Sequence, residues 1–325
     1  MITKSNYAPI VLFVYNRLWH TQQTIEALKK NELASQSNLI IYSDYAKNKE
    51  NRQKVDRVRE YLNTINGFNK ITIINRNTNW GLAKSIIDGV TAVVNEFGRI
   101  IVLEDDLVTS PYFLRFMNDS LSIYENEERV ASIHGYVYPI ENLPDTFFIR
   151  GADCWGWSTW KDRWNVFESD GQKLHDDLKL RGLKNEADFN GSYQFTSMLE
   201  DQILNRNDSW AIRWYMSTFL KNMLTLYPKI SFVQNIGLDN SGTHCNATFQ
   251  EPTELVNDYS LNKIVVNENV EARNKFEKYH IETRPSILQN IKSKLTPPPH
   301  LKKMKAISHV LSAIFNLSRK LVQKI

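Results

Sequence analysis

Two kinds of segment alternate along the first 135 residues: short runs of apolar residues, and longer segments in which apolar residues recur every three or four positions. Short apolar runs rich in β-branched residues predict strands at 9–15, 38–44, 70–76 and 99–105. Between them, apolar residues recur every three or four positions and predict helices at 18–30, 48–65 and 83–97. This alternation is typical of βαβ units, so we expect an α/β fold with a mainly parallel sheet flanked by helices.

The pattern becomes less regular beyond this region. Residues 136–250 are rich in Trp and Tyr, and four Trp fall within "WGWSTWKDRW". After the breaker "TPPPH", apolar residues recur at helical spacing opposite lysines and predict a basic amphipathic helix over 301–325. We therefore expect one domain made of two halves, 1–135 and 136–250, followed by a C-terminal extension over 251–325.

Composition narrows the class of protein. Two cysteines cannot form a disulfide framework, no zinc-ligand spacing occurs, and no apolar run reaches the length of a spanning helix, so a cytoplasmic protein is expected. The net charge of +4 combines a tail of +8 from Ser286 onward with a mildly acidic remainder. Because the basic residues gather in this tail and do not interleave with aromatic residues, nucleic-acid binding is disfavoured.

The end of the fourth predicted strand carries the most informative chemistry. In "RIIVLEDDL", an apolar run leads directly into Glu104, Asp105 and Asp106. Asn16 and Arg17 follow the first strand and Asp44 ends the second, and ligands of parallel sheets bind beyond such strand ends. A divalent cation, Mg²⁺ or Mn²⁺, would relieve the repulsion between the carboxylates. The alternative is a solvated acidic turn at the start of the next helix.

Several stretches resemble one family in the same order along the chain. They are "VYNR", "LIIYSD", "NRNTNWGLAKSI", "VLEDDLVTSPYF", "GADCWGWSTW", "LEDQIL" and "NIGLDNSGTHC". Together they resemble the GT-A glycosyltransferases, in particular the Golgi-type N-acetylglucosaminyltransferase I group with its EDD motif. The resemblance covers roughly residues 8–245, and the absence of a membrane stem suggests a bacterial enzyme of surface-polysaccharide biosynthesis.

The resemblance implies a binding site for a nucleotide-sugar donor in the first half of the domain. It implies that Asp106 holds the metal, that Arg17 contacts the nucleotide phosphates and that Asp44 contacts a uridine. Further donor contacts are expected from Asn16, Asn79, Gly81, Lys84, Glu104 and Asp105. His244 is a candidate for a diphosphate contact or a second metal ligand.

The resemblance also implies an acceptor site and a catalytic base in the second half. Trp155, Gly156 and Trp157 are expected to form the acceptor wall, with Trp157 exposed to the substrate. Asp201 is expected to be the base of an inverting displacement, and Glu200 is the second candidate. Both acids are equally compatible with an ordinary helix surface.

The expected function is therefore transfer of a sugar from a nucleotide diphosphate, a UDP-sugar by the resemblance, to a hydroxyl of a glycan or lipid-linked acceptor. The 301–325 helix is expected either to lie on the anionic inner face of the plasma membrane or to dock on protein. Two alternatives are a sugar-phosphate nucleotidyltransferase, which usually needs a glycine-rich loop that "FVYNRLWHT" lacks, and a non-catalytic glycan-binding protein.

Overall fold

A central sheet of eight strands organises the molecule. The computed structural model describes residues 7–239 and 254–283. The sheet order is β3-β2-β1-β4-β8-β6-β9-β7, and β10 and β5 form a separate two-stranded sheet. The strand bounds are β1 Ile10–Val14, β2 Asn38–Ser43, β3 Lys70–Asn75, β4 Arg99–Glu104, β5 Leu107–Thr109, β6 Val130–His134, β7 Thr146–Arg150, β8 Trp157–Trp160, β9 Leu224–Pro228 and β10 Val233–Asn235.

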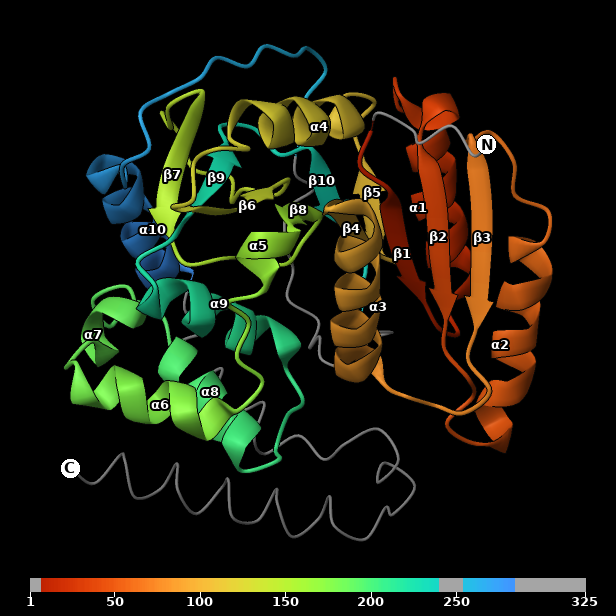
Figure 1. Ribbon diagram of the computed structural model, residues 1–325, viewed down its shortest axis with the longest axis horizontal. Helices are drawn as coiled ribbons and strands as arrows, with labels where there is room; N and C mark the ends of the chain where they lie inside the picture. Colours follow the sequence, from red (N-terminus) through yellow and green to blue (C-terminus); the bar gives the residue numbers. More distant parts are fainter. Residues whose placement is uncertain (1–6, 240–253, 284–325) are drawn as a thin grey trace, which may run out of the picture. The chain divides into compact units, whose positions relative to one another are not determined.

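Helices cover both faces of this sheet (Figure 1). They are α1 Leu18–Lys29, α2 Lys49–Leu62, α3 Leu82–Phe97, α4 Phe113–Ile123, α5 Lys161–Trp164, α6 Gly171–Leu180, α7 Lys184–Ala187, α8 Phe195–Ile203, α9 Trp210–Leu220 and α10 Val270–Glu282, with a 3₁₀ turn at Ala34–Gln36. The predicted α/β class is confirmed, and the first four predicted strands and three predicted helices occur within two or three residues of the expected bounds.

Strand direction follows the βαβ connections in the first half of the sheet. β3, β2, β1 and β4 are all parallel, whereas β8 is antiparallel to both of its neighbours, β4 and β6. β9 is parallel to β6 and β7 is antiparallel to β9. The carboxyl ends of β1, β2, β4 and β6 therefore lie along one edge of the sheet.

The alternation of side chains along β1 explains the two apolar layers. Ile10, Leu12 and Val14 pack with α1, α2 and α4 on one face. Val11 and Phe13 pack with α3 and with the tryptophans of α5 and α9 on the other. Because both faces are covered, the strand reads as an unbroken apolar run. A third cluster joins α6, α7, α8, α9 and α10.

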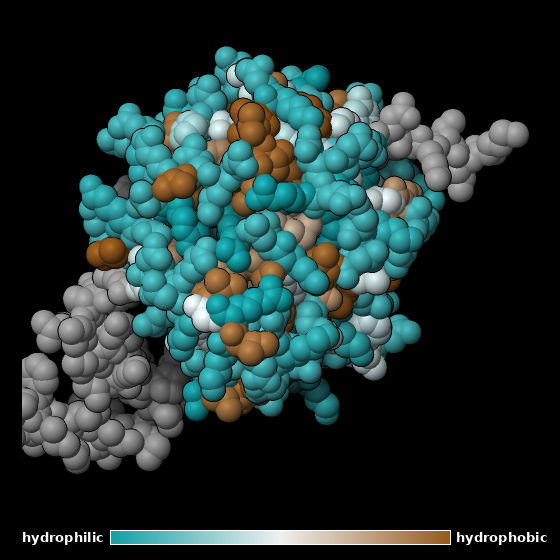
Figure 2. Space-filling model, turned by 60° about the vertical axis from the view of Figure 1, so that its left-hand side comes forward, coloured by the Kyte–Doolittle hydropathy of each residue, from teal (hydrophilic) through white to brown (hydrophobic). Residues whose placement is uncertain are grey.

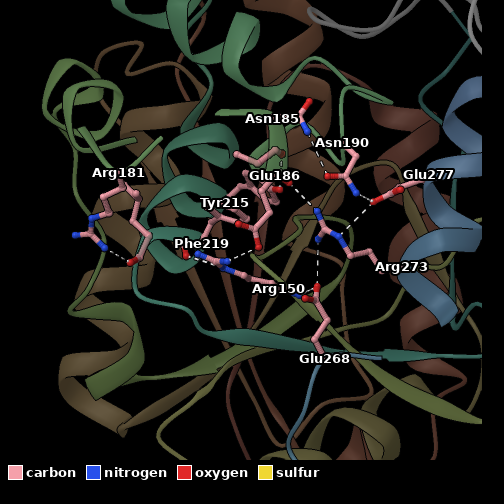
Figure 3. Close-up of polar contacts among 12 residues, drawn as sticks. Arg150, Arg181, Asn185, Glu186, Asn190, Tyr215, Phe219, Glu268, Arg273 and Glu277 are labelled. Atoms are coloured by element: carbon pink, nitrogen blue, oxygen red, sulfur yellow. Dashed lines mark hydrogen bonds and ion pairs between the residues drawn. The ribbon is translucent and has the colours of Figure 1, made fainter. Parts of the chain in front are cut away.

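Helix α10 belongs to the main compact unit, which extends from Met1 to His280. Phe276 of α10 is buried against Phe147 and Tyr227. The polar network drawn in Figure 3 also holds it: Arg273 pairs with Glu268 at 3.1 Å and donates to the Glu186 carbonyl at 2.7 Å. Residues 254–280 thus belong to the same compact unit as the sheet.

Exposed apolar side chains occur singly on the described surface. Figure 2 shows small brown patches in a mostly hydrophilic face. Trp19 and Leu180 are among the most exposed, at 56% and 86%. Within residues 7–239 and 254–283, no helix has the length and apolar character needed to cross a membrane. The amphipathic helix predicted over 301–325 lies outside the described residues.

Candidate active site

The polar residues predicted to converge do lie at one edge of the sheet. β2, β1 and β4 are consecutive in the sheet, and Asp44, Arg17 and Glu104 stand at or just beyond their carboxyl ends. Strands are spaced about 4.8 Å apart, so Asp44 and the acidic residues after β4 are separated by about 10 Å. An elongated polar ligand can span that distance along the edge.

Arg17 forms the centre of the site. Its side chain is 15% exposed and donates to both carboxylates that follow β4. Nη2 contacts Asp105 Oδ1 and lies 2.7 Å from Asp106 Oδ2, and Nε lies 3.5 Å from Asp105 Oδ2. Arg17 directly precedes α1, and Thr24 in the second turn of this helix anchors the acidic turn by donating to the Asp105 carbonyl at 2.9 Å.

Burial makes Glu104 and Asp105 hard to ionise. Burial raises the pKa of Glu104 strongly, and the charges of Asp106 and Asp105 raise it further. Burial also raises the pKa of Asp105, although Arg17 opposes the shift. Burial alone would lower the pKa of Arg17, but the two aspartates raise it on balance. Burial and mutual repulsion thus favour the neutral forms of Glu104 and Asp105, and Arg17 favours the charged form of Asp105.

A later segment of the chain closes against these acids. β10 pairs antiparallel with β5, and the Ile236 amide donates to the Asp106 carbonyl at 2.9 Å. A Cβ atom at Gly237 would lie 2.0 Å from Asp106 Oδ2 and 3.0 Å from Arg17 Nη1. Only glycine permits this approach, so the backbone at 237 forms a wall of the carboxylate site.

Asp44 organises the loop that leads into α3. Its two oxygens accept from the amides of Tyr45, Trp80 and Gly81 and from Asn79 Nδ2, at 2.8–2.9 Å. A carboxylate has about four lone-pair sites, and four donors occupy them. In this conformation Asp44 positions residues 79–81, and a direct contact with a nucleobase would have to replace one of these donors.

The remaining residues predicted to bind the donor lie around this loop. Asn16 donates to Asn51 at the start of α2, at 2.8 Å. Gly81 has a φ of 73° and begins α3, a left-handed backbone that favours glycine. Lys84 lies 4.2 Å from the centre of the Trp80 ring, which Arg76 contacts at 3.7 Å.

The site residues have the donor chemistry for a hard divalent cation. Asp105 and Asp106 supply oxygens, and Arg17 Nη1 is buried without a hydrogen-bond partner between them and the Gly237 backbone. Within the part of the chain that is described, no three His, Cys, Asp or Glu side chains converge as a complete metal cage. His244 lies outside the described residues.

The expectation that Trp157 faces a substrate is wrong. Trp157 is fully buried, pairs with Val102 across β8 and β4, and packs between Trp164, Trp210 and Trp214. Gly156 is buried and has a φ of 64°, and a Cβ there would lie 2.7 Å from Val233. Trp155 is half-buried against Tyr136 and remains the member of this group that a ligand could reach.

The two acids predicted as base candidates lie on the partly exposed surface of α8. Asp201 is 46% exposed and pairs with Arg206 at 3.1 Å. Glu200 is 40% exposed and lies 3.2 Å from Lys184. Their recorded partners lie on α6, α7 and the turn after α8, whereas the acidic residues after β4 contact Arg17.

Two residues beside the site were missed by the sequence reasoning. Gly237 lies within "NIGLDNSGTHC", a stretch that carries the resemblance as a whole. The sequence does not reveal which side chains the backbone of a loop glycine will contact. Asp153 lies within "GADCWGWSTW", a stretch with three tryptophans and a single carboxylate, between Ala152 and Cys154.

Comparisons with known proteins give partial overlaps in structure. No model of a known protein family matches the chain, and no curated protein matches it in sequence. A structure of S. aureus TarS, residues 1–349, overlaps at a TM-score of 0.31 with 11% identity, over 47% of each chain. The mannosyltransferase PcManGT from Pyrobaculum calidifontis, in complex with GDP-Man and Mn²⁺, overlaps at 0.30 with 11% identity, over 42% of this chain and 37% of its own. The chain thus spans less than half the length of each.

Proposed function

We propose that this protein is a metal-dependent glycosyltransferase that uses a nucleoside diphosphate sugar. The observation that carries the proposal is the buried group of Arg17, Asp105 and Asp106 at the carboxyl edge of a parallel sheet, closed by the Gly237 backbone. The loop held by Asp44 lies two strands away along the same edge. Such an edge suits a ligand with a charged diphosphate at one end and a flat base at the other.

Each part of the site has a role in the proposed reaction. Arg17 has one partnerless nitrogen, Nη1, that can donate to a phosphate oxygen as negative charge develops on the leaving diphosphate. Asp106, with Asp105, would hold a Mn²⁺ or Mg²⁺ ion, which acts as a Lewis acid toward the phosphate oxygens. The Trp80 ring lies beside the Asp44 loop, where Arg76 and Lys84 contact it, and a base that stacks there would displace one of these cations.

The nucleotide is proposed to be uridine, and this part of the proposal rests on the resemblance of "LIIYSD", which ends in Asp44, to the family's uridine-binding strand end. The acceptor is proposed to be a hydroxyl of a glycan or lipid-linked saccharide. A lipid-linked acceptor would give the basic 301–325 segment a use at the inner membrane surface. Co-sedimentation of the full chain and of a chain ending at 296 with anionic vesicles tests this, and equal binding by both removes it.

Thermal stabilisation by nucleotide sugars tests the main proposal. UDP-, GDP- and dTDP-linked hexoses are each added with and without Mn²⁺, and release of free nucleoside diphosphate is then measured. We expect one donor class to raise the melting temperature only with Mn²⁺, and Arg17→Met to abolish the shift.

Arg115→Met is the matched control, since Arg115 pairs with Glu32 on the surface, where both side chains are more than 40% exposed. A metal-dependent shift without nucleotide release over days would favour the non-catalytic glycan-binding alternative. Release of pyrophosphate from a nucleoside triphosphate and a sugar phosphate would favour a nucleotidyltransferase.

A further inference from the structure

Asp153 occupies an unusual place in the fold. It lies in the loop 151–156 between β7 and β8. The loop begins beside Met223, the residue before β9, and leads to the carboxyl ends of β4 and β6. Its side chain is 32% exposed, and Oδ1 lies 3.9 Å from Nε2 of the fully buried His134. His134 Nε2 accepts from the Trp155 amide at 3.0 Å, which fixes the loop over the end of β6.

The carboxylate of Asp153 is held by the backbone and reached by solvent. Oδ1 accepts from the Cys154 amide at 2.8 Å, and the side chain is 32% exposed. The exposed part of the carboxylate is able to accept a hydrogen bond from a ligand hydroxyl.

Aromatic side chains form the surroundings. The Asp153 charge acts on Tyr138 and Tyr193 as well as on Tyr227, and for each of the three burial is the first cause that raises the pKa of the phenol. Tyr193 is 36% exposed, whereas Tyr227 is 6% exposed. A partly exposed carboxylate and a partly exposed tyrosine ring are both suited to a sugar, whose apolar face stacks on a ring while a hydroxyl donates to an acid.

Asp153 is also close to the acidic residues after β4. A Cβ atom at Gly156 would lie 3.4 Å from Leu103 Cδ2, so the end of this loop runs beside the end of β4. The backbone agrees, because Trp157 pairs with Val102 and the loop residues before it continue past the end of β4. A group bound between Arg17 and Asp153 would therefore touch both.

We propose that Asp153 is the catalytic base of the transfer and that the ring of Tyr193 borders the acceptor site. This proposal rests on the proposed function. The Asp153 carboxylate takes the proton of an acceptor hydroxyl as that oxygen bonds to the anomeric carbon of the donor sugar. The bond from that carbon to the phosphate oxygen breaks, and its electron pair leaves with the nucleoside diphosphate.

The geometry favours Asp153 over the two acids of α8. Asp201 and Glu200 pair with Arg206 and Lys184 on the surface of the molecule and make no ion pair with Arg17, whose described ion pairs are with Asp105 and Asp106. Asp153 has donors but no cationic partner among the ion pairs recorded for it, apart from the buried His134 at 3.9 Å. Asp201 and Glu200 thus become the comparison variants.

The test uses the full chain, the donor that gives the largest Mn²⁺-dependent thermal shift, and methyl hexosides as acceptors. We expect Asp153→Asn to retain the donor-induced shift and to lose at least 100-fold in transfer turnover. Asp188→Asn is the matched control, because Asp188 also accepts a backbone amide and a hydroxyl, both from Thr196, at 2.7 and 2.5 Å. It should transfer at the wild-type rate.

Azide provides a readout that a purely structural role would not change. Azide is an anionic nucleophile and has no proton to remove, so it needs no base. When sodium azide is added, Asp153→Ala should therefore release nucleoside diphosphate and form the glycosyl azide. The wild type should not respond to azide. Three outcomes would overturn the assignment. They are a turnover of Asp153→Asn within fivefold of wild type, loss of the donor-induced thermal shift in Asp153→Asn, and azide rescue of Asp201→Ala in place of Asp153→Ala. A wild type with no donor-induced shift would count against the proposed function itself.

Discussion

Replacing Arg17 by Met should expose the electrostatic cost of the acidic group. The substitution keeps an unbranched side chain of comparable length but removes the charge that lies between Asp105 and Asp106. Those side chains are only 7% and 11% exposed, so they would be left as buried carboxylates without a cation. Removing one partner of a buried ion pair costs about 3–5 kcal/mol, and we expect the free energy of unfolding to fall by about that amount at pH 7.5.

Urea unfolding followed by circular dichroism measures this loss. Arg115→Met serves as the control, since its exposed pair with Glu32 should contribute no more than about 1 kcal/mol. The loss in Arg17→Met should shrink as the pH falls toward 5, because burial raises the pKa of Glu104 and Asp105 and they protonate early. A loss below about 1 kcal/mol, or one that is the same at both pH values, would refute the view that these carboxylates are buried and unsolvated.

Three further predictions concern single positions. Gly237→Ala should weaken Mn²⁺ binding at least tenfold in calorimetric titrations, because its Cβ would meet Asp106 Oδ2; unchanged affinity would mean that the loop moves aside at no cost. Asp44→Asn should speed hydrogen exchange at the Trp80 and Gly81 amides and lower the free energy of unfolding by about 2 kcal/mol. The control Asp56→Asn, on the exposed face of α2, should lower it by less than about 1 kcal/mol. Burial lowers the pKa of His134 below its usual value, so this histidine takes up a proton in the unfolded chain before it does so in the folded protein. As the pH drops below about 6.5, the free energy of unfolding should therefore fall by up to about 1.4 kcal/mol per pH unit. His134→Gln should flatten that slope, and an unchanged slope would show that other groups cause it.

The first half of the fold could be predicted because its signals are local. β1, β2 and β4 are buried along nearly their whole length and therefore read as continuous apolar runs, and the helices between the strands show the period of 3.6 residues. The edge where Arg17 and Asp106 meet follows from topology alone. Their hydrogen bonds, in contrast, depend on the turn after β4, which the pattern does not encode.

The second half was harder to predict because its elements are short and its contacts are distant. Trp157 was expected at a surface, since tryptophans near charged residues often bind sugars. Its burial depends on Trp210 and Trp214, which lie more than fifty residues away along the chain on a helix whose residues are buried on nearly all sides. Such a helix lacks the polar stripe that would have indicated its orientation.

The position of α10 has a consequence for synthesis of the chain. Arg273 and Arg150 bind the same acid, Glu268, yet they are made 123 residues apart, an interval of about 6 to 25 s at ribosomal rates of 5–20 residues per second. For that time Phe147 and, once made, Tyr227 lack the helix that covers them. A ribosome that stalls before residue 270 would therefore release a chain whose sheet is complete but whose apolar end is open, a natural substrate for chaperones and proteases.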